Sequence, residues 1–232
     1  MTKSIETDIL IIGAGPVGLF TVFEAGLLGL KCHLVDNLDK IGGQCIELYP
    51  EKPIYDIPGV PNQTGKEHID SLLKQIEPFD YEVHLNQRVD KIEESGDYWI
   101  AETTDGISFK TLNIFIAAGA GSFEPRKPPV ESPDKFLGKG IDYAVRSVDK
   151  YKDKDIVIFG GGDSALDWSV ELANKAKSIK LVHRRDDFRG AEHTENKMRN
   201  FVASGEIELK IPFVIKSIVC LLYTSPSPRD IG

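Results

Sequence analysis

The sequence predicts an α/β protein made of two three-layer domains, each a parallel sheet between helices, with a small antiparallel β-meander in the first. Two observations lead to this class. A buried strand, a glycine-rich turn and a helix occur in the same order twice, beginning at residues 8–12 and 155–159. Repeated strand–helix–strand units are typical of parallel sheets. Residues 81–111 instead alternate apolar and polar side chains between turn signals, which indicates short antiparallel strands.

The first copy of the repeated unit has the pattern of a phosphate-binding turn. A continuous apolar run leads into Gly13-x-Gly15-x-x-Gly18 and a predicted helix. Glycine at these positions permits a tight turn, close approach of a pyrophosphate to the backbone, and close packing of helix on strand. The next strand ends in Asp36, about 20 residues further on, where an acid accepts hydrogen bonds from a ribose. We therefore expect a dinucleotide site here, rather than a turn that binds nothing.

The second copy repeats this turn with one change. It reads Gly160-x-Gly162-x-x-Ala165 and aligns with the first copy without a gap, Gly160 taking the place of Gly13. A single motif of this kind is weak evidence, but a buried strand before it and a helix after it supply the required context. Two copies predict two nucleotides held so that electrons can pass between them.

The ends of the two copies differ in charge. Where the first copy has Asp36, the second has His183, followed by Arg184, Arg185 and Arg189. A carboxylate would repel a 2′-phosphate, whereas guanidinium groups bind phosphate through paired hydrogen bonds. The second copy therefore predicts a preference for NADP over NAD. The alternative is a solvated basic loop.

Thr64-x-x-Glu67 reads as a capping box that starts a further helix. The other expected elements are helices at 16–29 and 195–203, strands at 31–36, 113–118 and 207–211, a loop at 37–63 and a linker at 125–129.

Composition narrows the function classes. The net charge of −8 argues against non-specific nucleic-acid binding, which needs a positive surface. Cys32, Cys45 and Cys220 have no metal-like spacing and form no Cys-x-x-Cys, as expected in the cytoplasm. Residues 1–7 contain no signal-peptide core, and the apolar stretch 9–23 is broken by Gly and Pro, so no membrane span is expected. The 5 histidines show no ligand spacing, so we expect no metal.

Longer segments resemble the two-dinucleotide-binding flavoproteins to which low-molecular-weight thioredoxin reductases belong. The resemblance implies two Rossmann-like domains that bind FAD and NAD(P). Thioredoxin reductases carry Cys-x-x-Cys before the second motif, but residues 140–149 here contain no cysteine, so thioredoxin reduction is not expected. The resemblance runs from about Ile5 to about Ser217 and includes, besides the glycine motifs, Gly42-Gly-Gln44, Ile57-Pro-Gly59, Ala117-Ala-Gly119 and Val182-His-Arg-Arg-Asp-Asp-Phe-Arg189.

Residues 43–59 and 118–129 closely resemble the thioredoxin-reductase-like ferredoxin–NADP⁺ reductases. This resemblance implies that FAD exchanges electrons between NADP(H) and ferredoxin, with hydride passing between nicotinamide and flavin. Because the cofactors carry this chemistry, we expect no catalytic side chain. The expected FAD contacts are Gly13, Gly15, Gly18, Asp36, Gln44, Tyr49, Val89 and Phe123, and the expected NADP contacts are Gly160, Gly162, Ser164, Arg184, Arg185 and Arg189.

Several alternatives stay open at this point. Core packing is the alternative role of Tyr49 and Phe123, and a turn with a buried thiol is the alternative for 42–45. A different NADPH-dependent flavoprotein reductase, acting on flavodoxin, a quinone or another acceptor, is a second candidate function. An inactive nucleotide-binding fragment is a third.

The domain organisation expected from the sequence has three parts. Residues 1–122 form an FAD-binding domain without its C-terminal return segment, and 123–217 form an incomplete NADP-binding domain. Residues 218–232 resemble translated sequencing-adapter sequence, so the natural protein is expected to continue beyond about residue 217. By its resemblance the full-length protein is expected to be a cytoplasmic homodimer.

Overall fold

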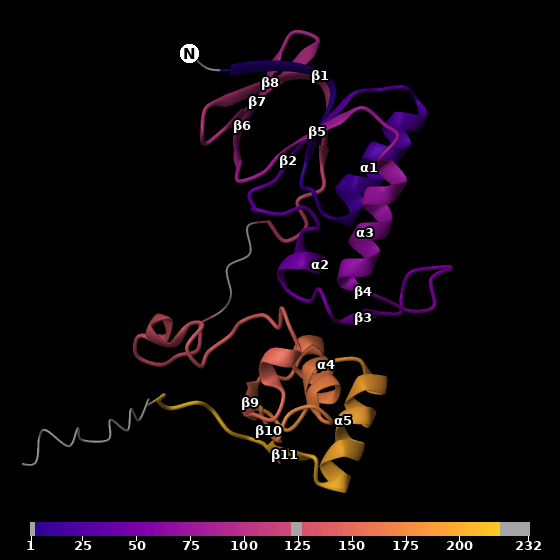
Figure 1. Ribbon diagram of the computed structural model, residues 1–232. Coiled ribbons are helices and arrows are strands. Elements are labelled where there is room, and N and C mark those ends of the chain that lie inside the picture. Colours follow the sequence, from indigo (N-terminus) through magenta and orange to yellow (C-terminus); the bar gives the residue numbers. More distant parts are fainter. Residues whose placement is uncertain (1–2, 122–126, 219–232) are drawn as a thin grey trace, which may run out of the picture. The chain divides into compact units, whose positions relative to one another are not determined.

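The computed structural model describes residues 3–121 and 127–218, and the chain divides into two compact units (Figure 1). Unit 1 comprises Met1–Pro125 together with Tyr143–Ser147, and unit 2 comprises Arg126–Asp142 together with Val148–Gly232. The boundary expected between residues 122 and 123 lies outside the described residues. The same holds for all but the first residue of the expected tail at 218–232.

Unit 1 is built on a six-stranded sheet with the order β5-β2-β1-β8-β7-β6. In the middle, Ile12 of β1 pairs in parallel with Val35 of β2 and with Ile116 of β8. The carboxyl ends of these three strands therefore meet at one edge of the sheet. The strands are β1 (Lys3–Ile12), β2 (Cys32–Val35), β5 (Tyr81–His84), β6 (Val89–Ser95), β7 (Tyr98–Thr103) and β8 (Ile107–Ile116).

Helices cover one face of this sheet. The long helices α1 (Pro16–Leu27) and α3 (Gly65–Ile76) lie side by side on it (Figure 1). Between them in sequence come the single-turn helix α2 (Gln44–Glu47) and a hairpin of β3 (Pro53–Ile54) and β4 (Gln63–Thr64). The main core lies between these helices and the sheet, and a smaller one on the opposite face is formed by Leu10, Val35, Ala101 and Phe109.

Helix α3 shows how the sequence specifies one of these elements. The Thr64 hydroxyl accepts a hydrogen bond from the Glu67 N–H at 3.2 Å, and the Glu67 carboxylate accepts one from the Thr64 N–H at 2.7 Å. This confirms the predicted capping box, which satisfies donors that the first helical turn leaves unpaired. Ile69, Leu72 and Ile76 then recur at helical spacing and are buried in the core.

Unit 2 repeats the design on a smaller scale. Its three parallel strands have the order β11-β10-β9, and one buried cluster contains Leu166, Leu181 and Met198. No helix among residues 3–121 and 127–218 combines the length and apolar character that a membrane crossing requires. The elements are the 3₁₀ turns η1 (Pro133–Phe136) and η2 (Asp149–Tyr151), strands β9 (Asp155–Phe159), β10 (Ser178–Val182) and β11 (Ile207–Lys210), and helices α4 (Asp163–Leu172) and α5 (Glu192–Ser204).

The predicted α/β class with two parallel-sheet units is confirmed, but four details are wrong. The strand at 155–159 is not buried as expected, because β9 is an edge strand, and Val157 and Phe159 are 50% and 51% exposed. The loop expected at 37–63 contains α2 and the β3–β4 hairpin.

The meander does not begin at residue 81, because β5 pairs in parallel with β2, which leaves β6, β7 and β8 as the antiparallel part. The strand expected at 113–118 is the second half of β8. It is not buried as expected, because β7 stops pairing at Thr111, and Phe115 and Ile116 are 47% and 74% exposed.

The capping box makes a testable contribution to stability. We expect Thr64→Ala to lower the free energy of unfolding of unit 1 by about 1 kcal/mol, since helix N-caps are typically worth that much. Urea unfolding followed by Trp99 fluorescence in a Trp168→Phe background would measure it. Ser71→Ala is the control within the same helix, because the Ser71 hydroxyl only hydrogen-bonds the Glu67 carbonyl one turn back. Equal losses in both variants would contradict the assignment.

The same cap is pH-dependent. Hydrogen bonds from Thr64 hold the pKa of Glu67 below its ordinary value. A group with a depressed folded-state pKa stabilises the fold above that range, and the effect disappears as the pH falls through the folded pKa. The difference between the parent chain and Thr64→Ala should therefore shrink in acid.

Candidate nucleotide-binding sites

The turn after β1 is packed so tightly that glycine is required. Gly13 has φ +111°, and a Cβ there would overlap the carbonyl oxygen of Ala117. A Cβ on Gly18 would overlap the carbonyl oxygen of Gly13, so α1 lies directly against the turn that precedes it. Gly15 differs, because a Cβ there would lie 3.8 Å from Gly43, an ordinary contact. Two of the three motif glycines thus serve close packing, and Gly15 leaves the backbone open to an incoming group.

Asp36, at the end of β2, ties this turn to the neighbouring strand. Its carboxylate accepts hydrogen bonds from the Ala14 N–H at 2.7 Å and the Leu38 N–H at 2.9 Å. Its own N–H donates to the carbonyl of His84 on β5 at 3.0 Å. An ionised carboxylate has about four lone-pair sites. The two that Asp36 uses internally leave others for hydroxyl groups of a ligand.

A pocket of about 250 Å³ opens at this edge of the sheet. It is below the roughly 300–1,000 Å³ typical of ligand sites, so it accommodates part of a dinucleotide rather than the whole. The predicted residues that line it are Gly13, Gly15, Asp36, Gln44 and Val89.

Two predicted FAD contacts lie outside the lining of this pocket, and a third is not described. Gly18 and Tyr49 are not among the lining residues of this pocket, and Phe123 lies outside the described residues. Tyr49 packs against the main core, and its hydroxyl accepts a hydrogen bond from the Cys45 thiol at 3.8 Å. Burial raises the pKa of Tyr49 to about 12 and also raises the pKa of Cys45. Cys45 therefore stays protonated and is a weak nucleophile, as expected of a buried structural thiol.

The pocket also has lining residues that sequence reasoning missed, among them Glu47, Gln87 and Arg88. Glu47 lies one helical turn after Gln44 and forms an ion pair with Arg146. The side-chain Oε1 of Gln87 accepts a hydrogen bond from the Thr103 hydroxyl at 2.8 Å, so the position of this side chain depends on β7. Gln87 and Arg88 directly precede Val89, but no motif marks them. Only the fold brings them to the pocket.

In unit 2 the second glycine turn opens toward solvent. The Gly160 N–H donates to the carbonyl of Val182 at 3.1 Å, which fixes the turn against β10. Gly162 is the N-cap of α4, with no side-chain cap and no atom within 4 Å of where a Cβ would stand. Ser164 is exposed in the first turn of α4. The positive end of this helix is therefore accessible to an anion.

His183 occupies the position that Asp36 has in unit 1. Its ring lies on Gly161, where a Cβ would overlap it, and it stacks on Phe188 with ring centroids 5.3 Å apart. The loop that follows returns to the same turn, since the Arg189 N–H donates to the Gly161 carbonyl at 2.7 Å. The side chains of Arg184, Arg185 and Arg189 are exposed beside the end of β10. A cationic surface therefore adjoins the accessible start of α4.

A second depression in unit 2, of about 420 Å³, is lined by Lys177, Ser178 and Glu206 among others. These residues lie at the amino ends of β10 and β11. Ligands of open α/β sheets bind at the carboxyl ends of the strands, so this depression is not the nucleotide site.

Comparisons with known proteins agree with this geometry. A family model described as pyridine nucleotide-disulphide oxidoreductase matches residues 7–220. Relatives named ferredoxin--NADP reductase from Bradyrhizobium sp. and Rhodopseudomonas palustris are 56% and 55% identical over 212 residues, which is 91% of this chain. The chain spans only 62% of the length of each.

Solved structures give the same result for the fold. A thioredoxin reductase of Lactococcus lactis has a TM-score of 0.78 at 26% identity, covering 92% of this chain and 67% of that one. A thioredoxin reductase of T. acidophilum has a TM-score of 0.79 at 17% identity, covering 93% and 67%. From the family match over most of its length, the chain belongs to the pyridine nucleotide-disulphide oxidoreductase family.

Proposed function

We propose that this chain is part of an FAD-dependent ferredoxin–NADP⁺ reductase, which exchanges electrons between NADP(H) and ferredoxin. The observation that carries the proposal is the pair of similar turns with opposite charges beside them. Asp36 adjoins the first turn, and Arg184 and Arg185 adjoin the second. The names of relatives more than half identical to this chain support the same function.

The residues at the first turn fit FAD. A Cβ on Gly43 would lie only 3.0 Å from Gly15, so the two backbones leave a narrow, side-chain-free approach to the start of α1. Helix α1 has no side-chain cap, which leaves its positive end to a pyrophosphate. Asp36 would bind ribose hydroxyls through its remaining lone pairs. When bound, FAD supplies the ability to exchange hydride on one side and single electrons on the other.

The residues at the second turn fit NADP. Gly162 and Ser164 at the exposed start of α4 would hold the pyrophosphate, and Arg184, Arg185 and Arg189 would hold the 2′-phosphate. His183 cannot repel that phosphate as a carboxylate would. Its ring packs on Gly161 and Phe188, and the arginines that follow it in sequence are exposed to solvent.

The electron acceptor is proposed to be an external carrier. A protein dithiol relay needs two neighbouring thiols, and the 3 cysteines of this chain form no Cys-x-x-Cys. Flavodoxin or a quinone in place of ferredoxin is the second candidate.

The cytoplasm as the compartment is supported by the free thiols of Cys32 and Cys45. A homodimer is proposed on the basis of the family resemblance.

The acceptor can be tested with two proteins. One is the 232-residue chain, and the other is residues 1–217 joined to the C-terminal part that the Bradyrhizobium relative has in addition. We expect the extended protein to bind FAD and to reduce ferredoxin with NADPH, and the shorter chain to do so far more slowly. Rates with ferredoxin, flavodoxin, thioredoxin and a quinone would be compared. Faster reduction of thioredoxin than of ferredoxin would reject the proposal.

The NADP assignment predicts a loss that depends on the 2′-phosphate. Arg184→Ala or Arg185→Ala should each weaken binding of 2′,5′-ADP about tenfold or more, since a hydrogen bond to a charged group contributes about 1.5–3 kcal/mol. Binding of 5′-AMP should change little. Calorimetry on the chain measures both. Lys177→Ala, at the opposite end of β10, is the control. Equal weakening of both ligands would show that the arginines do not read the 2′-phosphate.

Alanine substitutions of Gly15 and Gly18 in the first turn should affect stability and FAD affinity differently. Gly15→Ala puts a methyl group about 3.8 Å from Gly43, an ordinary contact, at a permitted φ of −78°, so stability should change by less than about 0.5 kcal/mol. FAD affinity of the extended protein should nevertheless fall, because the methyl group occupies the pyrophosphate approach. Gly18→Ala, which meets the Gly13 carbonyl, should instead destabilise the fold. Urea unfolding without FAD and flavin fluorescence titration give the two readouts.

A further inference from the structure

The pairing of β2 with β5 brings three chemically active side chains onto one face of the sheet. His33 on β2 is directly opposite Glu82 on β5, and Val35 is opposite His84. Successive side chains of a strand point to opposite faces, so Glu82 and His84 share a face, and His33 shares it with them. His33 and His84 are 51 residues apart in sequence. Spacing along the chain therefore gave no sign of this cluster.

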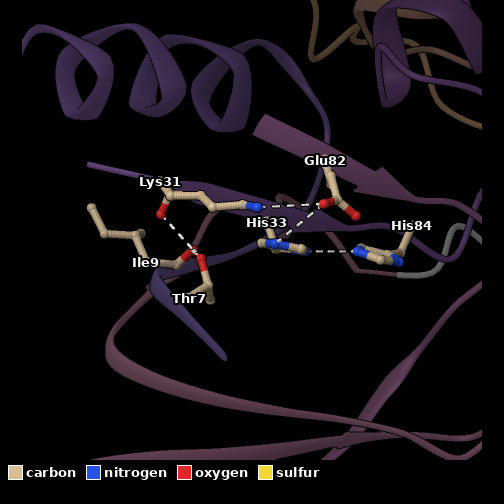
Figure 2. Close-up of polar contacts among 6 residues, drawn as sticks. All are labelled: Thr7, Ile9, Lys31, His33, Glu82 and His84. Carbon is tan, nitrogen blue, oxygen red and sulfur yellow. Dashed lines mark hydrogen bonds and ion pairs between the residues drawn. The ribbon is translucent and has the colours of Figure 1, made fainter. Parts of the chain in front are cut away.

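The distances within the cluster are short (Figure 2). His33 Nδ1 lies 2.9 Å from His84 Nε2, and His33 Nε2 lies 3.9 Å from Glu82 Oε1. One nitrogen of each ring and one carboxylate oxygen all lie within 4.8 Å of one another. Zinc bonds of about 2.0–2.2 Å hold tetrahedral ligands roughly 3.3 Å apart. Rotation of Glu82, whose side chain is 53% exposed, can supply the remaining movement.

The buried Nε2 atom of His33 needs an explanation, because no described residue hydrogen-bonds to it. Its side chain is only 2% exposed, and its Nε2 atom is buried without a hydrogen-bond partner among the described residues. A buried polar atom of this kind is rare in native proteins. A simple core pair with His84 accounts for Nδ1 but leaves Nε2 unused.

We propose that His33, Glu82 and His84 form a binding site for a divalent transition metal, best matched by Zn²⁺. Two imidazoles and one carboxylate are a known zinc donor set with a fourth position left for water. Cys32, the neighbour of His33, packs into the main core on the opposite face, so no thiolate joins the set. The site is separate from the nucleotide pocket, whose lining includes none of the three ligands.

One positive charge opposes the metal. Lys31 Nζ lies 3.5 Å from Glu82 Oε1 and competes for the carboxylate. The backbone of Lys31 is held by the Thr7 hydroxyl, which donates to its carbonyl at 3.0 Å (Figure 2). The lysine side chain, 40% exposed, can still move away into solvent. Metal binding therefore competes with the Lys31–Glu82 ion pair for the carboxylate, and removal of the lysine should favour the metal.

The metal would act as a clamp on the edge of the sheet. β5 is an edge strand of unit 1, and β2 is the only described strand that pairs with it. A bond between the two strands stabilises the folded form by an amount that rises with the logarithm of metal concentration above the dissociation constant, because the unfolded chain has no assembled site. The carbonyl of His84 also accepts the N–H of Asp36, so the clamp adjoins the strand end that lines the nucleotide pocket.

Zn²⁺ titration of the 232-residue chain by calorimetry tests the site. We expect one Zn²⁺ per chain, with affinity at least about tenfold weaker in Glu82→Gln and in His84→Gln, since even outer-shell changes cost that much. His68→Gln and Glu94→Gln are matched controls outside the cluster. They should bind as the parent does. Binding equal in all five proteins, or no binding by the parent, would overturn the proposal.

Two further experiments, a Lys31→Ala variant and Co²⁺ substitution, test the same site. Lys31→Ala should bind Zn²⁺ several-fold more tightly and show a larger zinc-induced rise in melting temperature. Co²⁺ in place of Zn²⁺ should give visible d–d bands without a thiolate charge-transfer band, and Glu82→Gln should lose those bands. Unchanged affinity in Lys31→Ala, or a thiolate band that survives in Glu82→Gln, would place the metal elsewhere.

Discussion

The edge of unit 1 at which we propose that FAD binds depends on the hydrogen bond between the Asp36 carboxylate and the Ala14 N–H. It joins the turn after β1 to the end of β2, and a second bond to Leu38 fixes the chain beyond. The close approach of Gly13 to Ala117 joins the same turn to the end of β8. Three strand ends are thus held together before any ligand arrives, so the ligand does not have to order them. Preorganisation of this kind lowers the entropic cost of binding.

In both units the glycine turn contacts the end of the neighbouring strand, but the two contacts differ in chemistry. Asp36 and His183 are equivalent positions, and so are Ala14 and Gly161. In each unit the two positions touch, through a hydrogen bond in unit 1 and through ring packing in unit 2. The second solution removes a negative charge and needs glycine beneath the ring. A change of one side chain therefore accompanies a change of its neighbour across the turn, and in the proposed function the two changes together set which nucleotide each edge binds.

The sequence predicted correctly those features that depend on contacts within a few residues of one another. The two glycine turns, the capping box at Thr64 and the buried run of β1 could be read from the sequence because each is specified within a few residues. The parallel pairing of β5 could not, since alternation at 81–84 fits either direction of pairing. Gln87 and Arg88 reach the pocket, and His33 meets His84, only through strand order and register. These depend on non-local contacts that no short segment encodes.

The second half of β8 has a consequence for handling the chain. From Leu112 onward β8 pairs with β1 on one side, and no described strand continues β7 on the other. Leu112, Phe115 and Ile116 are between 47% and 74% exposed there. An open edge with apolar side chains is a template for another chain to pair with. Solubility of the isolated chain should therefore be limited by association through this edge, despite a net charge of −8 that otherwise keeps molecules apart.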